Sequence, residues 1–202
     1  MLRAGTGVTT ITPPLGTPLS GHFEYREAAT VADDLTARAL VLDDGATRLA
    51  LVVCDLIRLP ASMVACARDR IAARTRIPAD NVLISATHTH TGPATYSGQG
   101  NAGEPPVRPD GPEPTYPLIS RVAGGLLSAP ADPAYVDWVA GRIADSVALA
   151  CARSVPARLA TGATDVAGVC FNRRYRMRDG TVVFNPGINN PDIVDVAGPV
   201  DP

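Results

Sequence analysis

The sequence predicts an α/β fold with a mixed sheet, at least one βαβ unit, helices packed on the sheet, and a long proline- and glycine-rich loop. Two observations predict this class. Short β-branched and aliphatic runs alternate with segments whose apolar residues recur at helical spacing. In addition, a strand, a helix and a second strand follow one another with short links, which is the pattern of parallel strands joined by a right-handed crossover.

The first strands come from the amino-terminal part of the chain. Residues 2–11 alternate loosely and predict a strand that Pro13 and Pro14 break. Residues 36–42 and 48–56 predict a hairpin, because Asp43-Asp44-Gly45 between them has the composition of a tight turn.

The βαβ unit is completed by the next two elements. A helix is expected over residues 61–75, beginning near Pro60 with Ser62 as its cap, and its apolar stripe comprises Val64, Ala67 and Ile71. A buried strand follows at residues 82–84. This strand is expected to lie parallel to the strand of residues 48–56.

The second half of the chain contains one strong helix. Residues 91–132 are rich in proline and glycine, and a loop of this length is typical of a lid or a pocket wall. Residues 133–153 predict a helix with Asp132 as N-cap and Pro133 at its first position. Beyond it we expect a strand over 157–169, a hairpin that turns at Asp179-Gly180, and a loop-like tail over 185–202.

Composition limits the class of protein. With 202 residues, 46% of them apolar, the chain is expected to form a single domain. A net charge of −2 argues against a nucleic-acid partner. Four cysteines without C-x-x-C spacing favour buried free thiols over disulfides. The polar amino terminus and the absence of an apolar run of ~20 residues predict no signal peptide and no membrane span. A cytoplasmic location is therefore expected, with secretion left open if the amino terminus is incomplete.

Two of the three histidines lie together at the end of the strand that begins at residue 82. If the backbone stays extended through Thr89, His88 and His90 point to the same face, because side chains two residues apart share a face of a strand. Two imidazoles at a rigid strand end form half of a metal site. The third histidine, His22, either faces this site or caps a turn.

Other polar residues are candidates for the surroundings of that site. Parallel strands end at the same sheet edge, where ligands bind in open α/β sheets, so Asp55 either orients an imidazole or starts the helix connection. In the later hairpin, alternation places Arg173 on the side of Tyr175 and Met177. A semi-buried anchoring role is therefore expected for Arg173, beside Asn172.

Five stretches together resemble the neutral and alkaline non-lysosomal ceramidases and their bacterial relatives. The specific stretch is Ser85-Ala-Thr-His88-Thr-His90-Thr-Gly-Pro93. Supporting matches are Ile11-Thr12-Pro13-Pro14 with Gly21, Arg38-Ala39-Leu40, the strand that ends in Asp55, and Asn172-Arg173. The resemblance implies that residues 1–202 correspond to the amino-terminal portion of the family's catalytic domain.

The resemblance also implies an activity, a cofactor and site residues. Members of the family are zinc-dependent amide hydrolases that act on ceramide, so a small amphipathic N-acyl or ceramide-like substrate is expected. His88 would be a ligand of Zn²⁺, His90 would face the substrate oxygen or the zinc-bound water, and Arg173 would match an arginine near the active site.

The family's other zinc ligands (a second histidine, a glutamate and a tyrosine) and its active-site serine lie further along than Pro202. From this we expect a truncated reading frame, a fragment or a degenerate copy, with a homo-oligomer or a second chain as sources of the missing ligands. Two alternatives remain: a ceramidase-like domain without activity, and a different H-x-H metallohydrolase. For the second alternative, the known H-x-H-x-D-H pattern would require an Asp and a final His after His90. This sequence has Thr91-Gly92-Pro93 there instead.

Overall fold

The computed structural model describes residues 1–21, 25–96, 131–166 and 168–200. The chain divides into two compact units, Met1–Arg158 and Leu159–Pro202, which are described separately below. The expectation of a single domain stays a prediction. His22 and most of the predicted lid over residues 91–132 lie outside the described residues.

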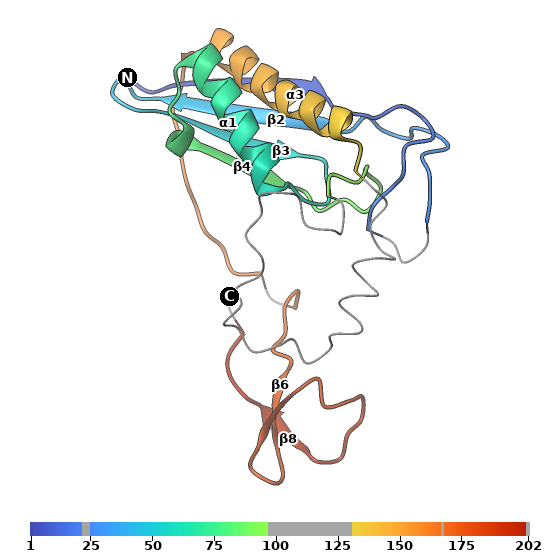
Figure 1. The fold of residues 1–202 in the computed structure, drawn as a ribbon. Helices are drawn as coiled ribbons and strands as arrows, with labels where there is room; N and C mark the ends of the chain where they lie inside the picture. The colour runs from blue at the N-terminus through green and yellow to red at the C-terminus, as the bar shows by residue number, and fades with distance from the viewer. Residues whose placement is uncertain (22–24, 97–130, 167, 201–202) are drawn as a thin grey trace, which may run out of the picture. The chain divides into compact units, whose positions relative to one another are not determined.

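The first unit is built on a five-stranded mixed sheet with the strand order β4-β3-β2-β1-β5 (Figure 1). Its members are β1 (Arg3–Thr10), β2 (Thr36–Asp43), β3 (Arg48–Cys54), β4 (Val82–Ala86) and β5 (Val155–Pro156). Neighbouring strands are antiparallel except for β3 and β4, which are parallel. The predicted α/β class and mixed sheet are therefore confirmed.

The predicted βαβ unit is present, because α1 (Ala61–Thr75) and the short 3₁₀ helix η1 (Ala79–Asn81) connect β3 to the parallel strand β4. The predicted cap is wrong. Pro60 occupies the N-cap position without a side-chain hydrogen bond, and Ser62 lies inside the first turn. A residue inside the first turn has helical dihedral angles, so its hydroxyl does not cap that turn.

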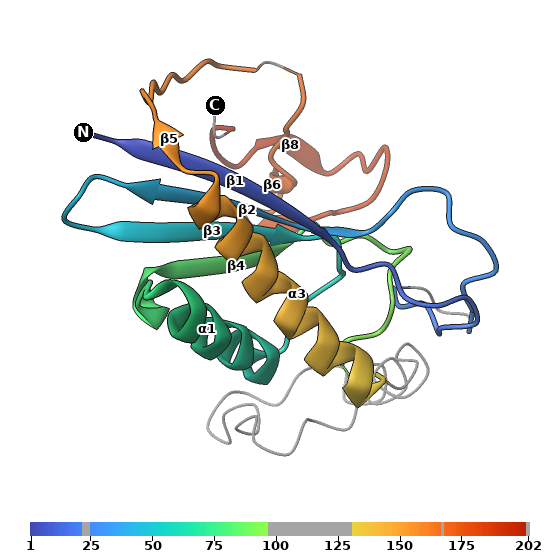
Figure 2. The same ribbon diagram turned by 90° about the horizontal axis from the view of Figure 1, so that it is seen from above.

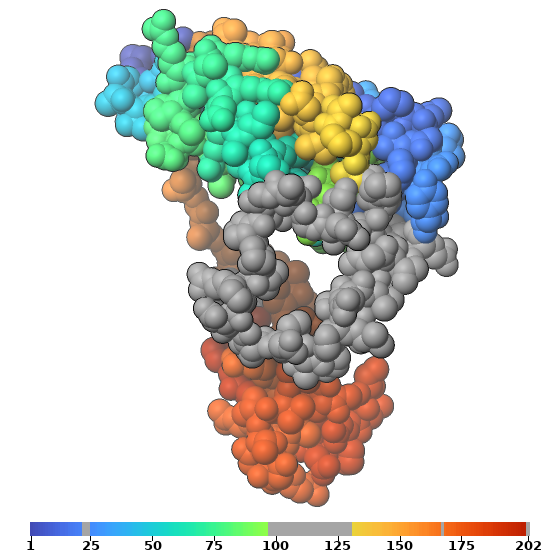
Figure 3. Space-filling view, viewed as in Figure 1, coloured from blue at the N-terminus to red at the C-terminus, as the bar shows by residue number. Residues whose placement is uncertain are grey.

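The second helix, α3 (Pro133–Ala152), begins as predicted. The side chain of Asp132 accepts a hydrogen bond from the backbone N–H of Ala134 at 2.9 Å, and proline follows the cap. Figures 1 and 2 show α1 and α3 lying side by side on the same face of the sheet, and their outer surfaces adjoin in the space-filling view (Figure 3). One face of the sheet is thus covered by helices.

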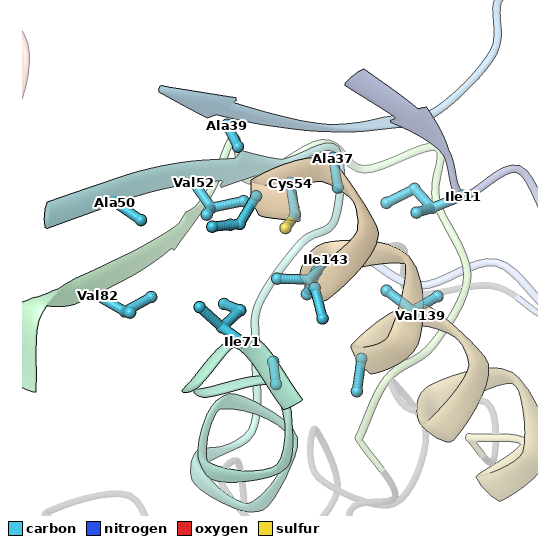
Figure 4. Packing of buried hydrophobic residues seen from close by; sticks show 14 of the residues in the cluster. Ile11, Ala37, Ala39, Ala50, Val52, Cys54, Ile71, Val82, Val139 and Ile143 are labelled. Atoms are coloured by element: carbon cyan, nitrogen blue, oxygen red, sulfur yellow. The ribbon is translucent and has the colours of Figure 1, made fainter. Parts of the chain in front are cut away.

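The core lies between that sheet face and the two helices (Figure 4). The sheet presents small and β-branched residues such as Ala50 and Val52, while Ile71 of α1 and Ile143 of α3 project toward them. Burial also raises the pKa of the Cys54 thiol to about 12, so this thiol stays protonated near neutral pH. The four cysteines are free, but only Cys54 is fully buried and Cys170 is exposed, so the prediction of buried thiols is wrong for Cys170.

Two glycines of β1 allow α3 to lie close to the sheet. An ideal Cβ placed on Gly5 would lie 2.0 Å from the carbonyl oxygen of Ala150, and one on Gly7 would lie 2.0 Å from that of Ser146. Both contacts are with helix backbone, which cannot rotate away as a side chain can. The absence of side chains at these positions therefore sets the spacing between β1 and α3.

The second unit contains a three-stranded antiparallel sheet with the order β7-β6-β8. Its strands are β6 (Arg174–Met177), β7 (Val182–Phe184) and β8 (Ile193–Val196). The predicted hairpin at Asp179-Gly180 is confirmed by the pairing of β6 with β7. The prediction of a purely loop-like tail is wrong, because β8 pairs with β6.

The strand predicted over residues 157–169 is also wrong. The described residues of this segment contain no strand, and the pairing with β1 is limited to the two residues of β5. Small residues without a partner strand do not form a ladder, because strand stability comes from cross-strand pairing and packing. Within the described residues, no helix is long and apolar enough to span a membrane.

Candidate metal centre

The histidine segment leaves the sheet earlier than predicted. Strand β4 ends at Ala86, and His88 has a left-handed backbone with φ of 63°. Backbone hydrogen bonds from Thr87 N to Cys54 O and from His88 N to Leu56 O, each 3.0 Å, hold the segment to the residues that end or follow β3. The expectation of extended backbone through Thr89 is therefore wrong, because the chain turns around the end of β3.

The two imidazoles nevertheless lie together. The ring centroids of His88 and His90 are 5.0 Å apart, with an angle of 79° between the ring planes. Both residues are exposed rather than packed into the aliphatic core. The left-handed residue costs roughly 1–2 kcal/mol for a non-glycine side chain, and strain of this kind is concentrated at functional sites.

Each ring is oriented by a backbone carbonyl. His88 Nδ1 lies 2.8 Å from the carbonyl oxygen of Ile57, and His90 Nδ1 lies 2.8 Å from that of Gly21. A carbonyl oxygen only accepts hydrogen bonds, so each Nδ1 must carry the proton and donate it. Nε2 then carries the lone pair in each neutral ring. A backbone carbonyl on one ring nitrogen is the usual way in which proteins prepare the other nitrogen as a metal ligand.

The sequence leaves two roles open for Asp55, orienting an imidazole or serving as an aspartate of the helix entry or turn, and its contacts favour the second. Its Oδ2 accepts hydrogen bonds from the backbone N–H of Thr36 at 2.9 Å and from the Thr36 hydroxyl at 2.7 Å, and lies 3.7 Å from a guanidinium nitrogen of Arg38. The carboxylate thus fixes the start of β2 beside the end of β3. The carbonyls of Ile57 and Gly21 do the orienting that was expected of Asp55.

A cleft of about 860 Å³ lies beside the histidine segment. Thr89 and Thr91, which alternate with the histidines, line it together with Asp55, Arg38 and parts of the loop over residues 27–35. Its walls combine hydroxyl, carboxylate and guanidinium groups with aliphatic side chains, so it suits a ligand that carries both polar and apolar parts.

Asn172 and Arg173 lie in the second unit and are described within it. Asn172 Oδ1 accepts a hydrogen bond from Arg174 N at 3.0 Å, and its Nδ2 donates to Pro199 O at 3.2 Å. Arg173 is exposed, with its guanidinium carbon 5.1 Å from the centroid of the Phe184 ring. The expected semi-buried position of Arg173 is therefore wrong, because the residue precedes β6 and leans on an exposed aromatic face.

The donor atoms fit zinc in kind but are too few to complete a site. Imidazole nitrogen is a common zinc ligand, and a catalytic zinc takes three protein ligands. Among residues 1–21, 25–96, 131–166 and 168–200, no group of three or more His, Cys, Asp or Glu side chains could hold a metal ion. The described residues therefore fit part of a zinc site.

Comparison with known proteins gives a structural likeness. No protein-family model and no curated protein sequence matches the chain. The crystal structure of neutral ceramidase from Pseudomonas aeruginosa matches 77% of this chain with a TM-score of 0.58 and 21% identity. A ceramidase complexed with C2 matches the same share with a TM-score of 0.57 and 22% identity. The chain spans 22% of each of those chains, and the likeness establishes a ceramidase-like fold.

Proposed function

We propose that this chain, which has a ceramidase-like fold, contributes part of the active site of a zinc-dependent amide hydrolase of the neutral ceramidase type. The reaction would be hydrolysis of the N-acyl bond of ceramide or a related N-acyl substrate by a zinc-activated water. The observation that supports this best is the pair of imidazoles, 5.0 Å apart, with both Nδ1 atoms engaged by carbonyls.

His88 is the proposed ligand of the metal. The Ile57 carbonyl keeps the proton on Nδ1, so Nε2 of the neutral ring is the nitrogen that would bind zinc. Zinc, when bound, lowers the pKa of its water to ~7 and polarises the carbonyl of a substrate. The backbone N–H of His88 donates a hydrogen bond to Leu56 O, which fixes this residue to the segment after β3. A ligand held by the scaffold in this way keeps its position when substrate enters and leaves.

His90 is the proposed partner of the reacting oxygen. In its neutral form, Nε2 accepts a proton from an attacking water, because Nδ1 is the protonated nitrogen. In its doubly protonated form, Nε2–H donates a hydrogen bond to the oxyanion that develops on the amide carbon. The proton that Nε2 takes from the water can then pass to the amide nitrogen, so the same ring can assist water attack and departure of the amine.

Arg173, Asn172 and His22 are assigned on the sequence and the resemblance alone. Arg173 would act on the substrate or the oxyanion, with Asn172 and His22 as supporting residues. Asp55 contributes to the wall of the cleft beside Thr89 and Thr91, and this cleft is the proposed entry for an amphipathic N-acyl substrate. Ligands from outside the described residues are required to complete the metal site.

A second candidate function is a ceramidase-like domain without catalysis. The absence of a three-residue ligand group among the described residues favours it. The two candidates differ in one measurable property: the hydrolase component binds zinc through His88, whereas the inactive domain carries no stoichiometric zinc.

The proposal is tested with the purified 202-residue chain, a fluorescent short-chain ceramide and elemental analysis. We expect zinc to co-purify in an amount that exceeds the background of a chelator-treated sample. We also expect ceramide hydrolysis close to that of a protein-free zinc control, because the described ligand set is incomplete. Zinc binding that is no tighter than that of a His88→Ala chain would favour the inactive domain. Efficient hydrolysis by these residues alone would contradict the incomplete-site assignment.

A further inference from the structure

The loop between β1 and β2 contains a segment that pairs with the histidine segment, and we call its described residues 18–21 and 25–27 the strap. Within it, Leu19 N donates to Arg26 O at 2.8 Å, and Pro18 and Glu27 form an isolated antiparallel bridge. The strap is bound to the residues that follow the histidines through the bridge between Leu19 and Pro93. Backbone bonds from Ser20 N to Gly92 O at 3.0 Å and from Ala94 N to Pro18 O at 3.3 Å complete this attachment.

Gly21 of the strap contacts His90 in two ways. Its carbonyl oxygen accepts the hydrogen bond from His90 Nδ1 at 2.8 Å. Its Cα lies so close to the ring that an added Cβ would be 2.8 Å from His90 Cγ and 2.8 Å from Ile57 Cδ1. Its φ of 95° is also one that side-chain-bearing residues rarely adopt. Position 21 therefore requires glycine for the ring of His90 to occupy its place.

Arg26 holds the backbone of the same histidine. Its Nη2 donates to the carbonyl oxygen of His90 at 3.1 Å. Its Nε is buried and has no hydrogen-bond partner among the residues that the structure describes. A buried donor without a partner costs folding free energy and offsets part of what the charged hydrogen bond to His90 contributes. The side chain of Arg26 is thus placed for its contact with the His90 backbone at the expense of one of its own donors.

We propose that Gly21 and Arg26 are positioning residues for His90, whereas the carbonyl of Ile57 fixes His88 independently. Gly21 sets the tautomer and the angle of the His90 ring, and Arg26 fixes the position of the backbone carbonyl of His90. The two imidazoles are then anchored by carbonyls from different parts of the chain, the strap and the segment after β3. A Cβ at position 21 would meet the side chain of Ile57 and not the carbonyl that holds His88. The catalytic meaning of this arrangement rests on the proposed function, but the anchoring itself requires no metal.

The test is nitrogen NMR of the metal-free chain labelled with ¹⁵N-histidine, which is readable because there are only three histidines. In the parent, recorded at a pH where the rings are neutral, both His88 and His90 should show the Nδ1–H tautomer. In Gly21→Ala, His90 should lose this preference and show mixed tautomers, while His88 keeps it. The matched control is Gly16→Ala, where φ is 82° and a Cβ meets nothing within 4 Å. The control should leave both rings unchanged.

A second variant keeps the proposal testable if Gly21→Ala fails to fold by circular dichroism. Arg26→Gln removes the guanidinium without adding a clash, and it should increase solvent exchange at the His90 Nδ1–H and leave His88 as in the parent. An unchanged His90 signal in the folded variants would overturn the proposal, as would equal loss at both rings. Failure of zinc binding in the parent would contradict the proposed function and leave this result intact.

Discussion

Replacing Gly7 with alanine is expected to unfold the first unit or to remove most of its stability. The new Cβ would lie 2.0 Å from Ser146 O and 2.8 Å from Ala150 N, both in the backbone of α3. Relief requires α3 to move off β1, which would disrupt the layer that carries Ile143 and Val147. Overpacking a core costs about 1–3 kcal/mol even where side chains can yield, and small domains have only about 5–15 kcal/mol in total. Because α3 must shift as a whole, we expect a loss of about 3 kcal/mol or more, which is most of the stability of a marginal domain.

The measurement is urea unfolding of the parent and the variant followed by circular dichroism. Gly162→Ala is the matched control, because a Cβ there meets nothing within 4 Å and φ at this position is ordinary. The control is expected to unfold within ~0.5 kcal/mol of the parent, as surface substitutions do. A Gly7→Ala chain that unfolds with the parent's midpoint would show that β1 and α3 are not in backbone contact.

Replacing His88 with alanine is expected to abolish zinc binding. His88 is the proposed direct ligand, and the loss of an outer-shell partner alone typically costs ~10–100-fold in metal affinity. Loss of the ligand itself should therefore weaken binding by more than ~100-fold. His90→Ala should retain much more affinity, because His90 is assigned to the reacting oxygen. Calorimetric titration of zinc into each folded variant measures both effects.

The difference in zinc affinity between His88→Ala and His90→Ala tests which of the two histidines is the metal ligand. Each ring is exposed and has Nδ1 at 2.8 Å from a carbonyl, so each variant removes an imidazole with the same kind of backbone hydrogen bond. A general effect of deleting an imidazole would appear equally in both. Equal loss of zinc affinity would contradict the division of roles, and a greater loss in His90→Ala would reverse it.

Most of the architecture could be predicted from local patterns. The βαβ unit follows from a strand, a helix with an apolar stripe and a strand, and the start of α3 follows from Asp132-Pro133. The prediction of a strand over 157–169 was wrong, and β8 was not predicted. Both errors have a related cause. Whether a short apolar segment forms a strand depends on a partner strand distant in sequence, as β6 is for β8.

The candidate site was predictable in its side chains but not in the backbone that holds them. The spacing of His88 and His90 indicated adjacent rings, yet the chain brings them together through a left-handed turn at His88 rather than an extended strand. The groups that orient the rings are the carbonyls of Ile57 and Gly21. Every residue has a carbonyl, so residue identity gives no signal for such a partner. Only the glycine at 21, already part of the resemblance, pointed to a close approach.

The imidazole of His88, which follows β4 after a turn, is proposed to bind zinc through Nε2. X-ray absorption at the zinc edge tests this proposal most directly, on the 202-residue chain loaded with one equivalent of zinc. We expect nitrogen ligands at ~2.0–2.1 Å together with the outer-shell scattering of an imidazole ring. A spectrum that shows bound zinc surrounded by water oxygens alone, without imidazole scattering, would contradict it.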